Sequence, residues 1–209
     1  MSIMVTHRTP NSTGFEAMIE SDSDASVLLR ERVLAAIADQ TSVDIVGNGS
    51  KAFYGRPTQG EPLSVAEHRG IINYEPTELV ITARCGTRLA DIEAVLAEHG
   101  QMLAFEPPHF GSDATLGGAV ATGLSGPRRP YAGAVRDVVL GTKLLNGHRE
   151  ILKFGGEVMK RGGYACRFRS PLGGEFQPLS KGLWRLHRNI KLAFDPHGIF
   201  NVGRLYEGW

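Results

Sequence analysis

The sequence predicts an α+β fold. Helical patterns and β-type runs follow one another without the regular strand–helix alternation of a doubly wound parallel sheet. An Asn-Gly pair between two apolar runs predicts a β-hairpin, which is typical of antiparallel pairing. With 209 residues, 42% of them hydrophobic and 22% charged, the chain has the composition of an ordinary globular protein. One large domain or two small ones can form from it.

The first half of the chain alternates helical and β-type patterns after a polar start. Residues 1–23 are polar and aperiodic, and we expect them to be poorly ordered. Thr87 is the expected N-cap of a helix, and Gly100 stands where a helix C-terminal glycine belongs. Apolar spacing predicts the remaining limits. The expected elements are a helix at about 24–39, strands at 43–46, 71–74 and 79–84, and a helix at 87–99.

The second half contains a hairpin and a final helix. A long apolar strand is expected at 137–145, and its partner at 150–154, because Asn146-Gly147 is a strong type I′ turn signal. The last helix is expected from about Ser180, with Leu179 and Trp184 as a hydrophobic staple. Its apolar face consists of Leu183, Leu186, Ile190 and Ala193, and Asp195-Pro196 ends it.

Charge and cysteine content exclude several classes of protein. A net charge of +1 gives no case for a nucleic-acid partner. Cys85 and Cys166 are far apart and form no CxxC pattern, which favours two free thiols in a reducing compartment. The start of the chain lacks the pattern of a signal peptide, and no apolar run is long enough to span a bilayer. We expect a cytoplasmic protein.

The first of two glycine-rich loops covers residues 43–55, VDIVGNGSKAFYG. Gly47, Gly49 and Ala52 satisfy the dinucleotide fingerprint GxGxx(G/A) after a strand. A Rossmann loop opens a long helix, however, and the prolines and glycine within 57–62 exclude one here. The loop also lacks the GK(S/T) ending of a P-loop. We interpret it as a nest of backbone N–H groups that suits phosphate, with a nicotinamide-dependent Rossmann dehydrogenase as a remote alternative.

The second loop covers residues 105–126, FEPPHFGSDATLGGAVATGLSG, and offers backbone rather than side chains. Thr115 is the expected cap of a short helix beginning near Leu116, in which Gly117-Gly118 allow a ligand to approach. Two such nests suit a ligand with two phosphates and a long body. The alternative that either is merely a tight loop stays open.

Several long motifs follow in a fixed order: GNGSKAFYGRP, YEPTELVITARCGT, EPPHFGSDATLGGAVATGLSGPRRP, VRDVVLGTKLLNG, FGGEVMK and FDPHGIFNVGRLY. Together they resemble the PCMH-type FAD-binding domain of the vanillyl-alcohol-oxidase family. More narrowly, the chain is similar to the FAD-binding subunits of bacterial glycolate oxidases, also called glycolate dehydrogenases. The resemblance covers most of residues 43–160 and 183–206, and it implies FAD held between two small α+β subdomains.

The resemblance also implies the cofactor-binding residues. Gly123-Leu124-Ser125 departs from the Asn-containing stretch that the wider family often has, which would leave a contact to backbone alone. The implied residues are Gly47, Asn48, Gly49, Ser50 and Lys51 at the pyrophosphate, Pro107, Thr115, Leu116, Gly117, Gly118, Ala121, Gly123 and Gly126 along the cofactor, Val138 and Val139 under the adenine, and Asn201 near the flavin ring.

A part of the family pattern is missing after FGGEVMK. The family continues there into a further flavin contact, a glycine-rich strand and a cap domain, whereas Lys160 leads directly to a segment that the family places before its C-terminal helix. We interpret Lys160–Arg161 as close to a deletion junction; a decayed AGY motif at 162–164 is the rival interpretation. The expected domains are a flexible N-terminus at 1–22, the FAD-binding domain at 23–160, and a C-terminal remnant with the last helix at 161–209, the cap being largely absent.

The resemblance implies a subunit of a complex that oxidises glycolate, a small 2-hydroxy acid, to glyoxylate through FAD. Its implied partners are a second flavin subunit and an iron–sulfur subunit, and it would meet the inner membrane only through the complex. The alternative is a shortened, non-catalytic interaction subunit, because the groups that position substrate would be sought in the cap. We do not expect the isolated chain to be catalytically competent without its partners.

No side chain identifies a catalytic role from the sequence. Lys51 either neutralises a phosphate or points to solvent. His109 either approaches the flavin or carries a covalent link to it, or it is satisfied by local hydrogen bonds, and we favour the last. Arg128-Arg129 either bind an acidic substrate or form an exposed basic pair, which is the default. The histidines lack metal-ligand spacing, and we therefore expect no metal site and leave the catalytic residues unknown.

Overall fold

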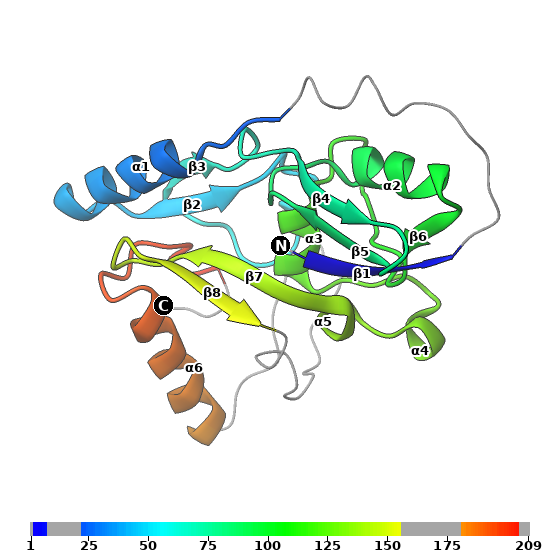
Figure 1. Cartoon of the computed structure of the whole chain (residues 1–209). Coiled ribbons are helices and arrows are strands. Elements are labelled where there is room, and N and C mark those ends of the chain that lie inside the picture. Colours follow the sequence, from blue (N-terminus) through cyan, green and yellow to red (C-terminus); the bar gives the residue numbers. More distant parts are fainter. Residues whose placement is uncertain (1, 8–21, 156–180, 205–209) are drawn as a thin grey trace.

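The structure, a computed structural model, describes residues 2–7, 22–155 and 181–204 (Figure 1). Its strands are β1 (Ser2–His7), β2 (Val43–Val46), β3 (Glu61–Ser64), β4 (Ile71–Glu75), β5 (Val80–Ala83), β6 (Gln101–Leu103), β7 (Val139–Leu145) and β8 (Ile151–Gly155). Its helices are α1 (Ser26–Ala38), α2 (Leu89–Glu98), α3 (Leu116–Thr122), α4 (Arg129–Ala132), α5 (Val135–Val138) and α6 (Lys181–Phe194). The α+β class predicted from the sequence is confirmed.

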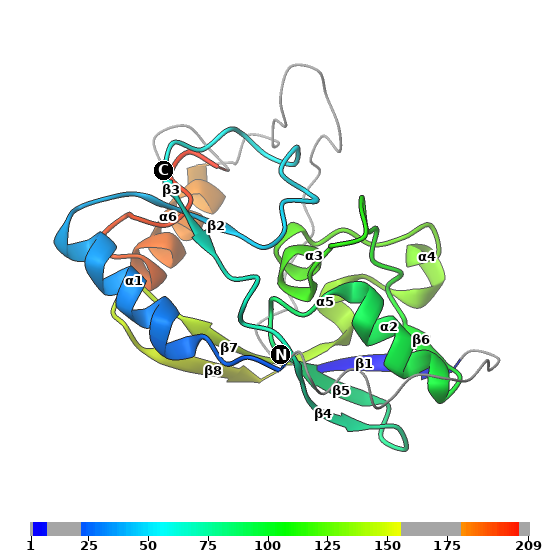
Figure 2. The ribbon, with the colours of Figure 1, turned by 90° about the horizontal axis from the view of Figure 1, so that it is seen from above.

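The larger half is an antiparallel sheet covered on one face by helices. Its strands lie in the order β4-β5-β1-β7-β8, and β6 pairs with the remaining part of β1. Figure 2 shows α2, α3 and α5 gathered over β1 and β5. Ile81 of β5 shares one buried cluster with apolar residues of these helices. The members of this cluster include Ile81, Ala83, Leu89, Ile92, Leu96, Leu103, Phe105, Leu116, Ala119 and Val135.

The smaller half is built on a parallel pair of strands. β2 and β3 pair in parallel, and a C-terminal stretch joins the other edge of β2 through a bridge between Val43 and Phe200. Val33 of α1 and Ile199 are almost fully buried in the core of this half. The β7–β8 hairpin joins the halves, because Val139 at its start belongs to the larger core and Leu145 packs against the smaller one (Figure 1).

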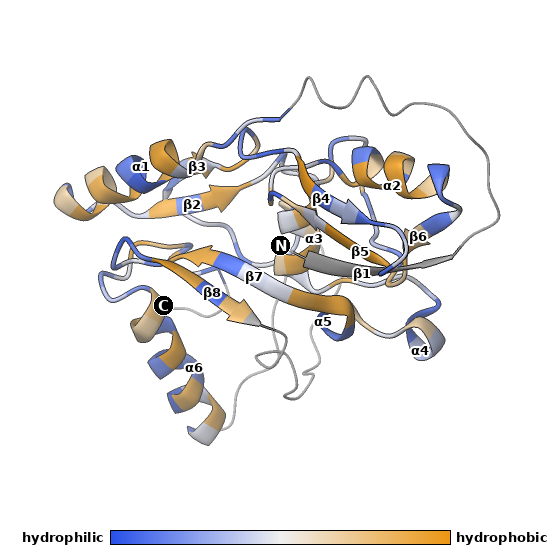
Figure 3. Ribbon diagram, in the orientation of Figure 1, coloured by the Kyte–Doolittle hydropathy of each residue, from blue (hydrophilic) through white to orange (hydrophobic). Residues whose placement is uncertain are grey.

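α6 stands out from the body of the fold. Figure 3 shows apolar and polar segments alternating along it. The apolar face expected from the sequence is present, but Leu183, Leu186 and Ile190 are each about half exposed. Phe194 at its C-terminal end meets Phe154 of β8 edge to face, with ring centroids 5.8 Å apart. Leu179 of the predicted staple lies outside the described residues.

The expectation of poor order over residues 1–23 is wrong at its beginning. β1 pairs antiparallel with β5, β6 and β7, which places it inside the main sheet. The run SIMVTH contains three β-branched residues, Ile3, Val5 and Thr6, which favour a strand. The polar residues that follow this short run obscured it in the sequence. The sequence patterns do not predict β3, β6, α4 and α5, each of which has four residues or fewer.

Two local predictions need correction. Arg88, with extended backbone, is the N-cap of α2, whereas Thr87 Oγ1 accepts a hydrogen bond from Gly70 N at 2.9 Å and donates one to Gly70 O at 3.1 Å. Thr87 therefore joins two loops instead of capping the helix. Gly100, with a φ of 63°, follows α2 as predicted. β7 begins at Val139 rather than Asp137, because the preceding residues form α5.

The hairpin between β7 and β8 is confirmed, but its turn is not type I′. Residues 146–150 connect the strands, and the positive φ of 71° belongs to Arg149. Asn146 Oδ1 accepts hydrogen bonds from His148 N at 3.0 Å and Glu150 N at 2.9 Å, so a side chain organises the loop. A Cβ atom on Gly147 would stand 2.9 Å from Pro196 Cδ. The glycine is therefore needed for close packing of the C-terminal segment.

Candidate functional site

The first glycine-rich loop follows β2 directly and folds into consecutive turns. Ala52 N donates to Gly49 O and Tyr54 N donates to Lys51 O, both at 3.0 Å. Gly49 has a φ of 73°, a conformation that glycine adopts without the steric penalty of a side chain. Residues 47–50 of this loop line a cavity. The predicted sequence of strand, backbone-rich loop and turn is confirmed.

The second loop leads into α3 as its sequence predicts. Thr115 is the N-cap, and its Oγ1 accepts a hydrogen bond from Gly118 N at 3.3 Å. Gly117 N donates to Cys85 O at 2.7 Å, and a Cβ atom on Gly117 would stand 2.8 Å from Cys85 Cβ. This glycine therefore allows α3 to lie against the segment that leads into α2. Burial raises the pKa of the Cys85 thiol.

The two loops are in direct contact. A Cβ atom on Gly47 would stand 2.5 Å from Thr115 Oγ1, so that only glycine fits there without movement. Asn48 Nδ2 donates to Asp113 O at 3.0 Å. These contacts bring the first loop against the beginning of α3, although Asn48 and Asp113 are 65 positions apart in the chain.

A second set of contacts joins the loops further along. Lys51 Nζ donates to His109 O at 3.4 Å and lies 5.9 Å from the centroid of the Phe110 ring. Phe53 meets Phe110 edge to face, with ring centroids 5.1 Å apart. The two loops identified in the sequence therefore form one structural unit.

The C-terminal segment is hydrogen-bonded to β2 and to the end of the first loop. Asn201 Oδ1 accepts from Ile45 N and Asn201 N donates to Val43 O, both at 2.7 Å. Arg204 Nη2 donates to Tyr54 O at 2.9 Å and to Ala52 O at 3.4 Å. The residues after α6 thereby fix both the strand that precedes the first loop and the turn that ends it.

A cavity of about 590 Å³ lies along the first loop, α3 and α6. Its volume is within the range of small-molecule and cofactor sites. The predicted cofactor residues that line it are Gly47, Asn48, Gly49, Ser50, Lys51, Thr115, Gly118, Ala121 and Asn201. The predicted residues outside its lining are Pro107, Leu116, Gly117, Gly123, Gly126, Val138 and Val139.

Some of the residues outside the lining have structural roles. Leu116, Val138 and Val139 are buried in the larger core. Gly123 has a φ of 64° and ends α3 in the left-handed conformation. A Cβ atom on Gly126 would stand 2.6 Å from Glu106 Cβ, so this glycine permits close packing.

The sequence did not identify the remaining wall of the cavity. It comes from α6, from residues near both ends of the first loop, from the end of α3 and from the C-terminal segment, whose positions depend on tertiary packing. The amphipathic pattern of α6 was visible, but nothing in it showed which segment it would face. The added lining residues are Asp44, Ile45, Val46, Ala52, Tyr54, Thr122, His187, Ile190, Lys191, Phe194, Phe200 and Arg204.

The charged groups of the cavity have different partners. Asp44 Oδ2 accepts from Thr58 Oγ1 at 2.7 Å. Lys191 Nζ forms an ion pair with Asp195 at 2.6 Å. Arg204 is bonded to carbonyl groups, as described above. Lys51 is 6% exposed, and burial lowers the pKa of its ammonium group.

The other candidate side chains have local partners. His109 Nε2 lies 3.1 Å from Glu93 Oε1, as expected for a histidine satisfied by local hydrogen bonds. Arg128 Nε donates to Glu106 Oε1 at 2.7 Å, and Arg128 N donates to the other oxygen at 3.1 Å. In the part of the chain that the structure describes, no group of three or more His, Cys, Asp and Glu side chains is placed to hold a metal ion.

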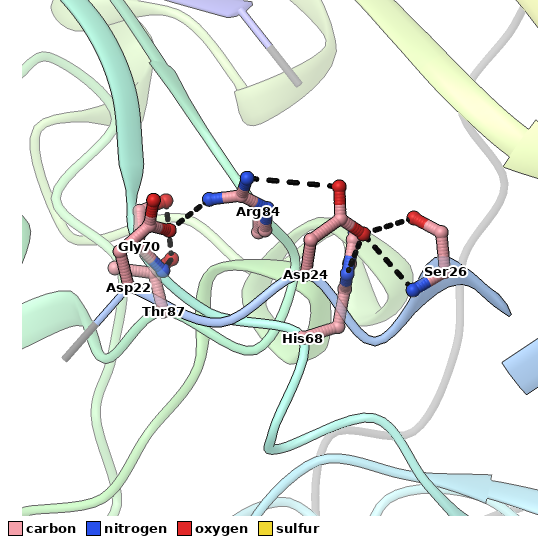
Figure 4. A network of polar contacts seen from close by, with 7 residues as sticks. All are labelled: Asp22, Asp24, Ser26, His68, Gly70, Arg84 and Thr87. Carbon is pink, nitrogen blue, oxygen red and sulfur yellow. Dashed lines mark hydrogen bonds and ion pairs between the residues drawn. The ribbon is translucent and has the colours of Figure 1, made fainter. Parts of the chain in front are cut away.

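A polar network joins the residues before α1 to the end of β5 and to the segment between β3 and β4 (Figure 4). Arg84 forms ion pairs with Asp22 and Asp24, and the Asp24 carboxylate also accepts from Ser26 N. His68 Nδ1 lies 3.5 Å from Asp24 Oδ1, close enough for an ion pair but without hydrogen-bond geometry. Burial lowers the pKa of His68. The hydrogen bonds to Asp24 lower the pKa of that carboxyl group.

This network is connected to the second loop through the backbone. Gly86 N donates to His68 O at 2.8 Å, and Leu116 N donates to Thr87 O at 2.9 Å. The segment that carries His68 is therefore linked through the residues before α2 to the start of α3. Among the helices of the described residues, none is long and apolar enough to cross a membrane.

Comparison with known proteins assigns this arrangement to a family. Glycolate oxidase subunit GlcE of Escherichia coli (strain K12) is 59% identical over 139 residues, which are 66% of this chain and 40% of that protein. The chain thus spans less than half the length of this relative. A solved structure of alkyldihydroxyacetonephosphate synthase is 17% identical, with a TM-score of 0.50 over 62% of this chain and 24% of that one, and supports the fold alone.

The family match covers the two loops and the hairpin that joins the halves. It extends over residues 29–155, more than half of the chain, and the matching family is described as an FAD binding domain. It includes the first loop, the second loop and the β7–β8 hairpin. The PCMH-type FAD-binding fold implied by the sequence motifs, with FAD as its cofactor, is confirmed. The chain belongs to the FAD-binding domain family.

Proposed function

We propose that this chain holds FAD along the cavity between its two glycine-rich loops, as the FAD-binding subunit of a glycolate-oxidising complex. The observation that carries the proposal is the direct contact between the loops, from Gly47 against Thr115 to Lys51 beside His109. It joins two backbone-rich segments into one elongated cradle. The 59% identity to a glycolate oxidase subunit supports the choice of substrate class.

The residues present fit such a cofactor. Gly47, Asn48, Gly49 and Ser50 of the first loop line the cavity, and a loop of small residues with accessible backbone N–H groups suits a pyrophosphate. The apolar lining from α6, including Ile190 and Phe194, suits the flat surface of a flavin ring. The cofactor residues implied by the sequence that lie outside the lining would then support the cradle rather than contact FAD.

The proposed reaction is a two-electron oxidation of glycolate to glyoxylate. Bound FAD supplies the electron acceptor for the hydride from the C–H bond next to the hydroxyl group. The hydroxyl proton passes to a base, and the carbon–oxygen double bond forms. In this chain the loops hold the cofactor, and Asn201, fixed to β2 by two hydrogen bonds, lines the cavity near α6.

Reconstitution with FAD tests the proposal. The purified chain is titrated with FAD, and binding is followed by the visible flavin bands and by quenching of flavin fluorescence. We expect saturable binding by the wild-type chain and weaker binding by Gly47→Val, which introduces a side chain against Thr115. Absence of flavin bands and of FAD uptake by a folded wild-type chain would refute the proposal.

A second candidate is a subunit that binds FAD but does not turn over substrate. Two cations of the cavity lining that could bind the carboxylate of a substrate, Lys191 and Arg204, are already held by Asp195 and by backbone carbonyl groups. Asp44, a carboxylate of the lining that could accept a proton, accepts a hydrogen bond from Thr58 on one of its oxygens. Glycolate-dependent reduction of a dye separates the candidates. Turnover by the FAD-loaded chain excludes the second, whereas FAD binding without turnover, in the presence of the partner subunits, favours it.

The proposed complex also contains a second flavin subunit and an iron–sulfur subunit. Such partners would carry electrons away from FAD. We place the chain on the cytoplasmic side, in contact with the inner membrane only through the complex. We further propose that residues 23–160 form the FAD-binding domain and that 161–209 contribute a C-terminal part with α6. Co-purification with the partner subunits tests the assembly.

A further inference from the structure

Lys51 is a buried cation in the first loop. Its side chain is 6% exposed, it belongs to the cavity lining, and it follows directly the residues that offer backbone groups there. Among the residues that the structure describes, no carboxylate forms an ion pair with it. A buried ammonium group without an anion is unfavourable, because it loses its hydration.

The protein groups around Lys51 compensate only part of this loss. An ammonium group has three donors. Two weak hydrogen bonds are present, to His109 O at 3.4 Å and to Ser50 Oγ at 3.5 Å, both longer than ordinary N–H···O bonds. The Phe110 ring lies 5.9 Å from Nζ and adds a cation–π contact. The surroundings are consistent with a group that lacks a strong acceptor.

The other cations of the cavity do not share this condition. Lys191 is paired with Asp195 at 2.6 Å, and Arg204 donates to Tyr54 O at 2.9 Å. Both have roles in holding the C-terminal segment. Among the cations of the described lining, Lys51 is therefore the one best placed to neutralise the negative charge of a ligand.

We propose that Lys51 is the counter-ion of the FAD pyrophosphate, supplying the full positive charge that the backbone nest lacks. The inference rests on the proposed FAD binding and assigns to one side chain the charge recognition within it. Backbone N–H groups carry only partial charges, whereas the pyrophosphate carries full negative charge. Lys51 lines the cavity next to Gly49 and Ser50, and its Nζ is held between the two loops by contacts with His109 and Phe110.

The proposal links FAD affinity to pH. Burial lowers the pKa of Lys51 in the free protein, and an adjacent phosphate raises it by favouring the charged form. FAD therefore binds best when Lys51 is protonated, and its affinity falls as the pH rises through the pKa of the free protein. A variant without this amine lacks that component of the pH dependence.

The test compares FAD binding and stability of four full-length chains. They are wild type, Lys51→Met, Lys51→Arg and Lys143→Met, the last removing an exposed lysine of β7. We expect Lys51→Met to weaken FAD binding about 10- to 100-fold, the range of a lost charge-assisted hydrogen bond. Lys51→Arg should recover part of the affinity, and Lys143→Met should bind as wild type does. Thermal unfolding of the FAD-free proteins should show Lys51→Met as stable as wild type or more so.

The FAD affinity and the melting temperature of Lys51→Met together decide whether Lys51 has this role. Weaker FAD binding by a stable Lys51→Met chain, with a flatter pH profile on the alkaline side of neutrality, supports the proposal. Unchanged affinity overturns it, as does a loss of affinity that follows only from a lower melting temperature. If the folded wild-type chain fails to bind FAD, the proposed function fails first, which distinguishes the two results.

Discussion

Gly47 lies so close to Thr115 that a Cβ atom on Gly47 would stand 2.5 Å from Thr115 Oγ1. The same hydroxyl accepts the hydrogen bond from Gly118 N that caps α3. Thr115 is almost fully buried, which limits its freedom to move. The contact between the two cofactor loops therefore requires glycine on one side and a capping side chain on the other.

Replacing Gly47 by alanine should separate the loops. The added methyl group forces Thr115 or the first loop to move, and such overpacking costs about 1–3 kcal/mol of folding free energy. We expect FAD binding to weaken by about tenfold or more, since a displacement worth about 1.4 kcal/mol is tenfold in affinity. Urea unfolding measures the first effect, and FAD titration measures the second.

Two variants control this prediction. Gly182 of α6 has no neighbouring atom within 4 Å of its would-be Cβ, and Gly182→Ala should leave FAD binding unchanged. Thr115→Ala removes the hydroxyl that Gly47→Ala would meet, at the expense of the cap. If Gly47→Ala costs as much in the Thr115→Ala background as in the wild type, the contact does not set the geometry of the loops.

Thr115 and Thr87 show how far the sequence could predict local structure. Both threonines precede apolar helical patterns, which predict both of them as N-caps. Thr115 is one, whereas Thr87 bonds to Gly70 and leaves the N-cap to Arg88. The helical pattern was sufficient to locate both helices. The hydrogen-bond partner of each hydroxyl depends on the loop that tertiary packing places beside it. The sequence pattern does not indicate which loop that is.

The candidate site, too, could be predicted from the sequence only in part. The glycine-rich composition of residues 43–55 and 105–126 was enough to identify both loops. Their contact through Gly47 and Thr115, and the support from Arg204, join segments far apart in the chain. Such contacts leave no periodic pattern in the sequence. Their residues could be interpreted only after the fold placed them together.

Asp195 should be essential for the C-terminal segment. Its buried carboxylate accepts hydrogen bonds from Ile199 N and Phe200 N, both at 2.9 Å, and pairs with Lys191. Asp195→Ala leaves these donors without their acceptor, and a buried donor such as Ile199 N that loses its acceptor costs about 1–3 kcal/mol. We expect a lower urea midpoint. Asp39→Ala, at an exposed carboxylate after α1, should change the midpoint little; equal effects of the two would contradict this role for Asp195.

Arg204 should hold the end of the first loop. Its guanidinium group donates to Tyr54 O and Ala52 O, and Arg204→Met removes both hydrogen bonds. Because these carbonyls end the turn after Lys51, we expect FAD affinity to fall by about tenfold, the effect of about 1.4 kcal/mol. Arg204→Lys should recover part of it, and the exposed Arg129→Met should have no effect. Fluorescence titration with FAD compares the three, and an unchanged affinity in Arg204→Met would exclude the supporting role.

His68 should make the stability of the protein dependent on pH in the mildly acidic range. Burial lowers its pKa from the ordinary value of 6.5, so the folded protein favours the neutral ring. The unfolded chain binds this proton at a higher pH, and stability is therefore complete above about pH 6.5 and decreases as the pH falls through the lower pKa of the folded protein. Asp24 has a lowered pKa and acts in a separate range, below its ordinary value of 3.8.

Urea unfolding from mildly alkaline to mildly acidic pH measures the contribution of His68. The wild-type chain should lose stability towards the acidic end, and His68→Gln should lose less over the same interval because it cannot take up the proton. His148→Gln, at an exposed loop position, should follow the wild-type curve. His68 lies between β3 and β4 and is connected to α3 through Gly86 and Thr87, so FAD affinity should weaken over the same interval. A His68→Gln curve parallel to that of the wild type would show that His68 does not cause the pH dependence.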